Sequence, residues 1–303
     1  MKKHAKSLLI AATLVLAATP ATVYAQVDET VQQNVDGIAI QNHAPGEFVD
    51  LEGHFAKNAA NHLGNMGLMM KKMKTNFNPD APIDRKEFVD LVEKGLGKKN
   101  DSMNNADAHL TRLDVAELIA KSMPAVNTGI NGGNMSLAYD DTPGITADQK
   151  TALQYLYMTG IMVGDGQGHF NPKASLTRGE AAVLLESAIE RSLQGGKDVA
   201  YEKQSGEFSE AVYTLVNENK MQEGLFSVVD GDTRYLLLSG GEVPTGGFSV
   251  IVGNIKETDA GIFVQATLKV PVEGQMMTEA VDHPYAVIAI KDTTKPVYLI
   301  GQE

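Results

Sequence analysis

Three arginines share a local pattern in which the arginine stands between a helix-capping residue and an acid. The segments are Thr177-Arg178-Gly179-Glu180, Thr111-Arg112-Leu113-Asp114 and Asp84-Arg85-Lys86-Glu87, and a leucine follows each arginine by six residues. A Thr or Asp can cap a helix by accepting from the backbone N–H three residues later, and an acid at that position can bond back to the cap. We therefore predict three helix starts, each with arginine at the first helical position.

These arginines belong to an internal repeat. An offset of 93 residues brings Phe77-Asn78-Pro79 onto Phe170-Asn171-Pro172 and Arg85 onto Arg178. If the offset is shortened by two residues upstream, Asp50 aligns with Asp141. A partial copy around Arg112 lies between the two. Similarity at a fixed spacing is the sequence signature of a repeat architecture. The chain is therefore predicted to contain a duplicated unit with a shortened middle copy.

An arginine at a helix start needs an explanation, because its charge opposes the positive end of the helix dipole. One interpretation is an anion site, in which free N–H groups, the dipole and a guanidinium face one carboxylate or phosphate. The other is that each arginine pairs with an acid of its own repeat, such as Asp50 or Asp141, and stabilises the fold. The residues alone leave both interpretations open.

The repeated residues resemble the S-layer homology family. Copy three carries Tyr139-Asp140-Asp141, a Gly160-Ile161-Met162-Val163-Gly164 turn, Phe170-Asn171-Pro172 and Leu176-Thr177-Arg178-Gly179-Glu180. The resemblance implies a pseudo-threefold bundle of helical repeats that binds secondary cell-wall polysaccharide, often through a pyruvylated sugar. It implies a polymer-binding set of Arg178, Arg112, Arg85, Thr177, Gly164 and Asp141, with Arg178 ranked first because copy three has the fullest motif.

The chain departs from that family in several places. It has no tryptophan, and His54-Phe55-Ala56 stands where the family prefers His-Trp-Ala. Asp84 replaces the threonine of copy one, Lys71 replaces its second turn glycine, and the middle copy has no recognisable first helix. We therefore expect only one or two working pockets.

The remainder of the chain has strand character. A helix is predicted from Glu207 to Met221, followed by runs rich in β-branched and aromatic residues at 226–229, 235–238, 248–252, 262–270, 285–290 and 297–300. Pro244-Thr245-Gly246-Gly247-Phe248 and His283-Pro284-Tyr285 resemble motifs of the PrcB C-terminal family, whose members accompany proteases. That resemblance implies a non-catalytic accessory or recognition role beside a surface protease.

The predicted fold class is therefore multidomain: an all-α domain of S-layer-homology-like repeats, followed by a small β-rich α+β domain. The expected bounds are a signal peptide at 1–25, an N-terminal segment at 26–47, repeats at 48–193 (48–96, a partial 97–138, and 139–193), a linker at 194–206 and the β-rich domain at 207–303.

The first residues are typical of a secretory signal peptide. Lys2, Lys3 and Lys6 precede an apolar run from Leu8 to Ala18, and the segment closes on Val23-Tyr24-Ala25. The run is short for a bilayer span, so export with cleavage before Gln26 is expected over an uncleaved anchor. We expect a secreted protein at the cell wall or S-layer surface, with no membrane contact after cleavage.

Charge and composition limit the classes of partner and chemistry. The net charge of −12 becomes −15 when the three lysines of the signal peptide are removed, which argues against nucleic acid and acidic membranes as partners. The chain has no cysteine, its histidines lack paired metal spacing, and no Gly-x-Ser-x-Gly elbow is present. We expect no catalysis, no metal and no cofactor.

Three hypotheses follow. The first is a surface protein anchored to an anionic secondary cell-wall polysaccharide, with a C-terminal module that binds a surface protease or another envelope protein. The second is an S-layer scaffold component whose repeats no longer bind glycan. The third is an enzyme with a site in the β-rich region around Gly246 and Tyr285.

Overall fold

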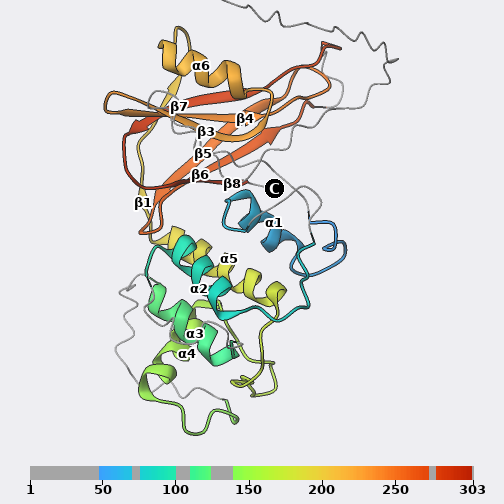
Figure 1. The fold of residues 1–303 in the computed structure, drawn as a ribbon, viewed down its shortest axis with the longest axis vertical. Helices are drawn as coiled ribbons and strands as arrows, with labels where there is room; N and C mark the ends of the chain where they lie inside the picture. Colours follow the sequence, from blue (N-terminus) through green and yellow to red (C-terminus); the bar gives the residue numbers. More distant parts are fainter. Residues whose placement is uncertain (1–47, 70–75, 100–109, 124–138, 273–277, 302–303) are drawn as a thin grey trace, which may run out of the picture. The chain divides into compact units, whose positions relative to one another are not determined.

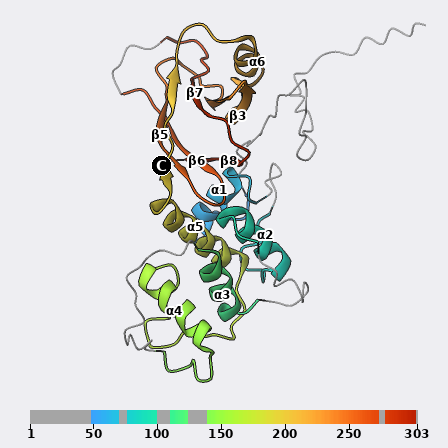
Figure 2. The same ribbon diagram turned by 90° about the vertical axis from the view of Figure 1, so that its left-hand side faces the viewer.

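The computed structural model describes residues 48–69, 76–99, 110–123, 139–272 and 278–301. The predicted signal peptide and the segment 26–47 lie outside these residues, so both stay predictions. The first five helices are α1 (Lys57–Asn65), α2 (Arg85–Leu96), α3 (Arg112–Ser122), α4 (Ala147–Thr159) and α5 (Arg178–Gln194). Figures 1 and 2 show α4 beside α3, and α1 and α2 beside α5.

The three predicted helix starts are confirmed, since α2, α3 and α5 each begin at an arginine. Thr111 and Thr177 form complete capping boxes with Asp114 and Glu180. Asp84 caps α2 by accepting from the backbone N–H of Glu87. The side chain of Glu87 bonds to Arg178 and not to the cap of its own helix.

The β-rich region contains one helix and two sheets. Its elements are β1 (Lys197–Asp198), β2 (Glu202–Gln204), α6 (Glu210–Asn219), β3 (Glu223–Asp230), β4 (Thr233–Gly240), β5 (Ser249–Glu257), β6 (Ile262–Lys269), β7 (Tyr285–Lys291) and β8 (Val297–Gly301). All six predicted strand runs and the predicted helix are present. The segment 194–206, expected to be a linker, contributes β1 and β2.

Each sheet has four strands. The orders are β1-β5-β6-β8 and β2-β7-β4-β3, with every pair antiparallel except β6 and β8. Buried residues such as Leu236, Ile288 and Val264 fill the space between the sheets. On the other face of the second sheet, α6 packs its Val212 and Leu215 against the strands (Figure 1).

The helices and the first sheet share one hydrophobic core. Phe263 of β6 and Tyr298 of β8 belong to the same buried cluster as residues of α1 to α5, and the Tyr298 hydroxyl donates to the Lys94 carbonyl at 3.3 Å. Gly97, at φ +79°, ends α2 so close to the β5–β6 turn that an added Cβ would lie 2.3 Å from the Ala260 nitrogen.

The predicted fold class is therefore wrong. Instead of an all-α repeat domain followed by a separate small β-rich domain, the described residues all belong to one contact unit. Its described residues contain six helices and eight strands in two sheets. The physical reason is the shared core, because small residues at the end of α2 and in the β5–β6 turn let the two regions pack without a gap. The residue bounds given for the repeats and linker stay predictions.

Candidate anion-binding site

The Phe-Asn-Pro loops of copies one and three are held by the aspartates that open each copy. The Asp50 carboxylate accepts from the backbone N–H groups of Phe77 and Asn78, both at 2.7 Å. Asp141 accepts in the same way from Phe170 at 2.8 Å and Asn171 at 2.7 Å. Both aspartates therefore have a structural role within their own repeat.

These contacts shift the acidity of the two aspartates. Partial burial disfavours the charged form, but the two backbone N–H donors outweigh it and hold the pKa of Asp50 below its usual value. The same balance lowers the pKa of Asp141, with a further contribution from His169. Both loops are thus fixed by ionised carboxylates at neutral pH.

Arginines from other repeats contact the same loops. Arg178 donates through Nε to the Phe77 carbonyl at 2.7 Å and lies over the Phe77 ring, 5.0 Å from its centroid. Arg112 donates to the Phe170 carbonyl at 2.9 Å and lies 5.1 Å from that ring's centroid. The two arrangements are near copies of each other.

The predicted site residues are therefore divided between two places. Arg112 from the middle copy joins Asp141 and Gly164 of copy three, because its Nη2 also donates to the carbonyl of Val163, next to Gly164, at 2.9 Å. Thr177 and Arg178 begin α5 against the loop of copy one instead.

Arg85 is the third arginine of the predicted set. Its Nη2 lies 3.5 Å from a carboxylate oxygen of Asp114 in the α3 capping box. The structure thus places Arg85 with neither loop and pairs it with an acid of the middle copy.

The first backbone donors of α5 and α3 are used within the protein. Arg178 and Gly179 donate through their N–H groups to the carbonyls of Ala81 and Pro79 at 2.8 and 2.9 Å. In α3, Arg112 and Leu113 donate likewise to carbonyls of the copy-three loop at 2.8 and 3.1 Å. An anion at these sites would therefore be bound by guanidinium N–H groups and not by the helix terminus.

The three arginines differ in their carboxylate partners. Arg178 donates through Nη1 to both carboxylate oxygens of Glu87, and Arg85 pairs with Asp114. Among the residues that the structure describes, Arg112 has two carbonyl acceptors and no ion pair. Glu180, the corresponding acid of α5, is bonded to its own cap Thr177. Sequence reasoning missed the Glu87 contact because that acid fits a capping box.

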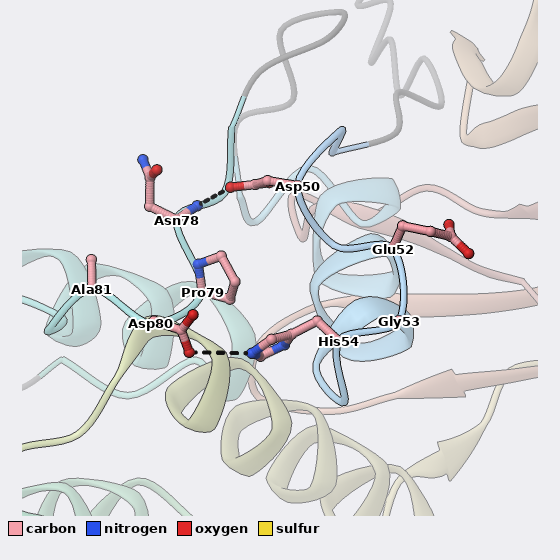
Figure 3. A pocket seen from close by; sticks show the side chains of 8 residues that line it. All are labelled: Asp50, Glu52, Gly53, His54, Asn78, Pro79, Asp80 and Ala81. Atoms are coloured by element: carbon pink, nitrogen blue, oxygen red, sulfur yellow. Dashed lines mark hydrogen bonds and ion pairs between the residues drawn. The ribbon is translucent and has the colours of Figure 1, made fainter.

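A cavity of about 520 Å³ lies beside the copy-one loop (Figure 3). Three carboxylates line it: Asp50, Glu52 and Asp80. Asp50 is bonded to the loop, Glu52 pairs with Lys57 at 2.6 Å, and Asp80 faces His54 at 3.5 Å. This concentration of carboxylates makes the cavity unfavourable for an anionic group.

Within the described ranges, no group of His, Asp and Glu side chains could hold a metal ion. Among the same residues, no helix is both long enough and apolar enough to cross a bilayer.

Two segments match known family models. Residues 138–182 match the S-layer homology domain, and residues 234–291 match the PrcB C-terminal family. The chain is 31% identical over 86 residues to the surface-layer 125 kDa protein of Lysinibacillus sphaericus, a stretch that covers 28% of this chain and 7% of that protein.

A solved structure, an undecaheme cytochrome from the S-layer of Carboxydothermus ferrireducens, aligns with 71% of this chain and 39% of its own, at 12% identity and a TM-score of 0.31. That score is too low to indicate a common fold. The S-layer homology match and the surface-layer relative assign the protein to the cell surface, in the cell wall or S-layer.

Proposed function

We propose that this surface protein is held non-covalently by an anionic secondary cell-wall polysaccharide, and that Arg112 is its main anion-binding side chain. The S-layer homology match at residues 138–182 supports polymer binding. The matched copy supplies the Phe170 and Val163 carbonyls that orient the Arg112 guanidinium. In this proposal the chain acts by binding and not by catalysis.

The single observation that carries the choice of Arg112 is its lack of a carboxylate partner among the described residues. A guanidinium has five N–H donors, and two carbonyl bonds leave donors for a ligand carboxylate. Arg178 would first have to give up Glu87, which would leave a half-buried acid without its partner. The exposed Lys173, one residue before the Ala174 carbonyl that accepts from the Arg112 N–H, adds positive charge.

The proposal is tested with cell walls that retain the secondary polymer and with walls stripped of it. The secreted chain should sediment with the first and not with the second, and its retention should fall as salt is added, because solvent-exposed ion pairs are screened. Equal retention on both kinds of wall would support the alternative of a scaffold protein whose repeats bind no glycan.

In the same proposal the β-rich region binds an envelope protein such as a surface protease. The PrcB C-terminal match at residues 234–291 supports this role, as do Val270 and Val272 after β6, whose exposed fractions are 63% and 65%. The double substitution Val270→Ser and Val272→Ser should lower the protease activity retained on protein-coated walls. Val49→Ser, at a residue of 54% exposure before α1, is the matched control and should leave that activity unchanged.

A further inference from the structure

Exposed large apolar side chains lie in or next to the turn whose backbone contacts Arg112. In the described part of the repeat region, five such residues are more than 40% exposed: Val49, Phe55, Tyr157, Met158 and Val163. Tyr157 and Met158 lie in the last turn of α4, and Val163 lies in the following turn at 160–164, where its carbonyl accepts from Arg112. Exposed apolar groups gathered in this way mark a binding surface more often than single ones do.

Tyr157 is joined to Arg112 by a row of rings. The Arg112 guanidinium lies over Phe170, whose ring centroid is 5.5 Å from that of Tyr139, and Tyr139 meets Tyr157 edge to face at 6.3 Å. Phe170 is buried, Tyr139 is half-buried and Tyr157 is 47% exposed. The row therefore runs from the proposed anion-binding side chain to an aromatic ring on the surface.

The rigidity of this row comes from its surroundings. Gly164 lies against Tyr139 so closely that an added Cβ would be 2.6 Å from the ring, and Gly160 ends α4 at φ +73°. The turn between Tyr157 and Val163 is also anchored by Ile161 and Met162, which are buried, while Tyr157 and Val163 stay exposed. A preformed surface loses little conformational entropy when a ligand binds.

We propose that Tyr157, with Val163 beside it, is the apolar wall on which a sugar ring of the polymer lies while Arg112 binds its acidic substituent. This inference rests on the proposed function. One face of a pyranose ring carries C–H groups and packs on an aromatic ring, whose hydroxyl can bond to a sugar hydroxyl. A sugar with an acidic substituent matches both halves of this surface, and Tyr157 supplies an aromatic wall in a chain without tryptophan.

The test compares Tyr157→Ala with Tyr213→Ala in the full secreted chain, using polymer-bearing and stripped walls as probes. Tyr213 of α6 is a matched control, because it is 46% exposed and meets Phe208 edge to face at 5.5 Å. Tyr157→Ala should weaken binding to polymer-bearing walls on the order of tenfold, as expected for an aromatic anchor. Tyr157→Phe should lose at most about threefold, since it keeps the ring.

Each outcome decides between the two proposals. Suppose that the wild type binds only polymer-bearing walls and that Tyr157→Ala binds as well as Tyr213→Ala does. The role of Tyr157 in sugar binding is then overturned and the proposed function stands. If the wild type binds both kinds of cell wall equally, the proposed function is contradicted, and the role of Tyr157 that rests on it is contradicted too. If Tyr157→Ala instead changes the sedimentation velocity of the free protein, the patch contacts a second copy of the chain and the inference is overturned.

Discussion

The substitution Asp141→Asn tests whether the copy-three loop is held as described. The Asp141 carboxylate accepts from two backbone N–H groups at 2.8 and 2.7 Å. An asparagine can keep one of these bonds, while its NH₂ group would face the second donor. Loss of one charge-assisted bond should lower the free energy of unfolding by about 2–3 kcal/mol. For a chain of this size the midpoint of thermal unfolding should fall by about 4–12 °C.

Urea unfolding followed by far-UV circular dichroism measures this change. Asp140→Asn is the matched control, because it removes the same charge at the neighbouring exposed residue. Asp140 bonds to the loop segment through its backbone N–H, which donates to the Gly168 carbonyl, and that bond survives the substitution. Equal destabilisation by the two variants would refute the assignment of Asp141 to the loop.

The effect of Asp141→Asn should depend on pH. The folded protein holds the pKa of Asp141 below its usual value of 3.8, so the carboxylate contributes stability above that value and loses it as the pH falls through the folded pKa. The difference in unfolding free energy between wild type and variant should therefore be full at about pH 7 and shrink below about pH 4. A difference that stays constant to low pH would mean that the charge of Asp141 is not what holds the loop.

Three further outcomes follow from the shared core and the site. In urea unfolding, Gly97→Ala should destabilise the protein by about 1–3 kcal/mol more than Gly53→Ala. Both glycines have positive φ, but only at Gly97 do backbone atoms lie within 4 Å of the added Cβ. Tyr298→Phe should cost about 0.5–1.5 kcal/mol by removing its bond to the Lys94 carbonyl, and no loss would mean that the bond is absent in solution. Wall retention of Arg112→Ala should fall less steeply with salt than that of the wild type, since one screened contact is missing; an unchanged slope would exclude Arg112 from the contact.

Local features were predictable from the sequence, and long-range partners were not. The capping residues Thr111 and Thr177 lie three positions from their partners, so spacing alone identified these helix starts. Arg178 bonds to Phe77 at a separation of 101 residues, and a single sequence gives no signal for which repeat an arginine will contact. For this reason, neither the anion-site interpretation nor the ion-pair interpretation predicted that an arginine of one repeat contacts the loop of another.

The error in fold class has a similar origin. Gly97 and Ala260 are small residues in segments typical of a helix end and a turn, and nothing in the sequence indicates that they meet where the helices and the first sheet share a core. The strands β1 and β2 are two and three residues long and largely exposed, so they carry no hydrophobic alternation that could reveal them. Their pairing depends on β5 and β7, far along the chain.

The most direct test of polymer binding compares Arg112→Ala with Arg178→Ala on polymer-bearing walls. The two arginines make the same loop contacts, with Nε bonds of 2.9 and 2.7 Å and ring distances of 5.1 and 5.0 Å. Arg178→Ala also removes the partner of Glu87, so its structural loss should be at least as large as that of Arg112→Ala. Because Arg178 pairs with Glu87 while Arg112 has no carboxylate partner among the described residues, we expect Arg112→Ala to weaken retention by roughly tenfold or more and Arg178→Ala to have a much smaller effect. Equal losses, or a larger loss for Arg178→Ala, would contradict the assignment of the anion site to Arg112.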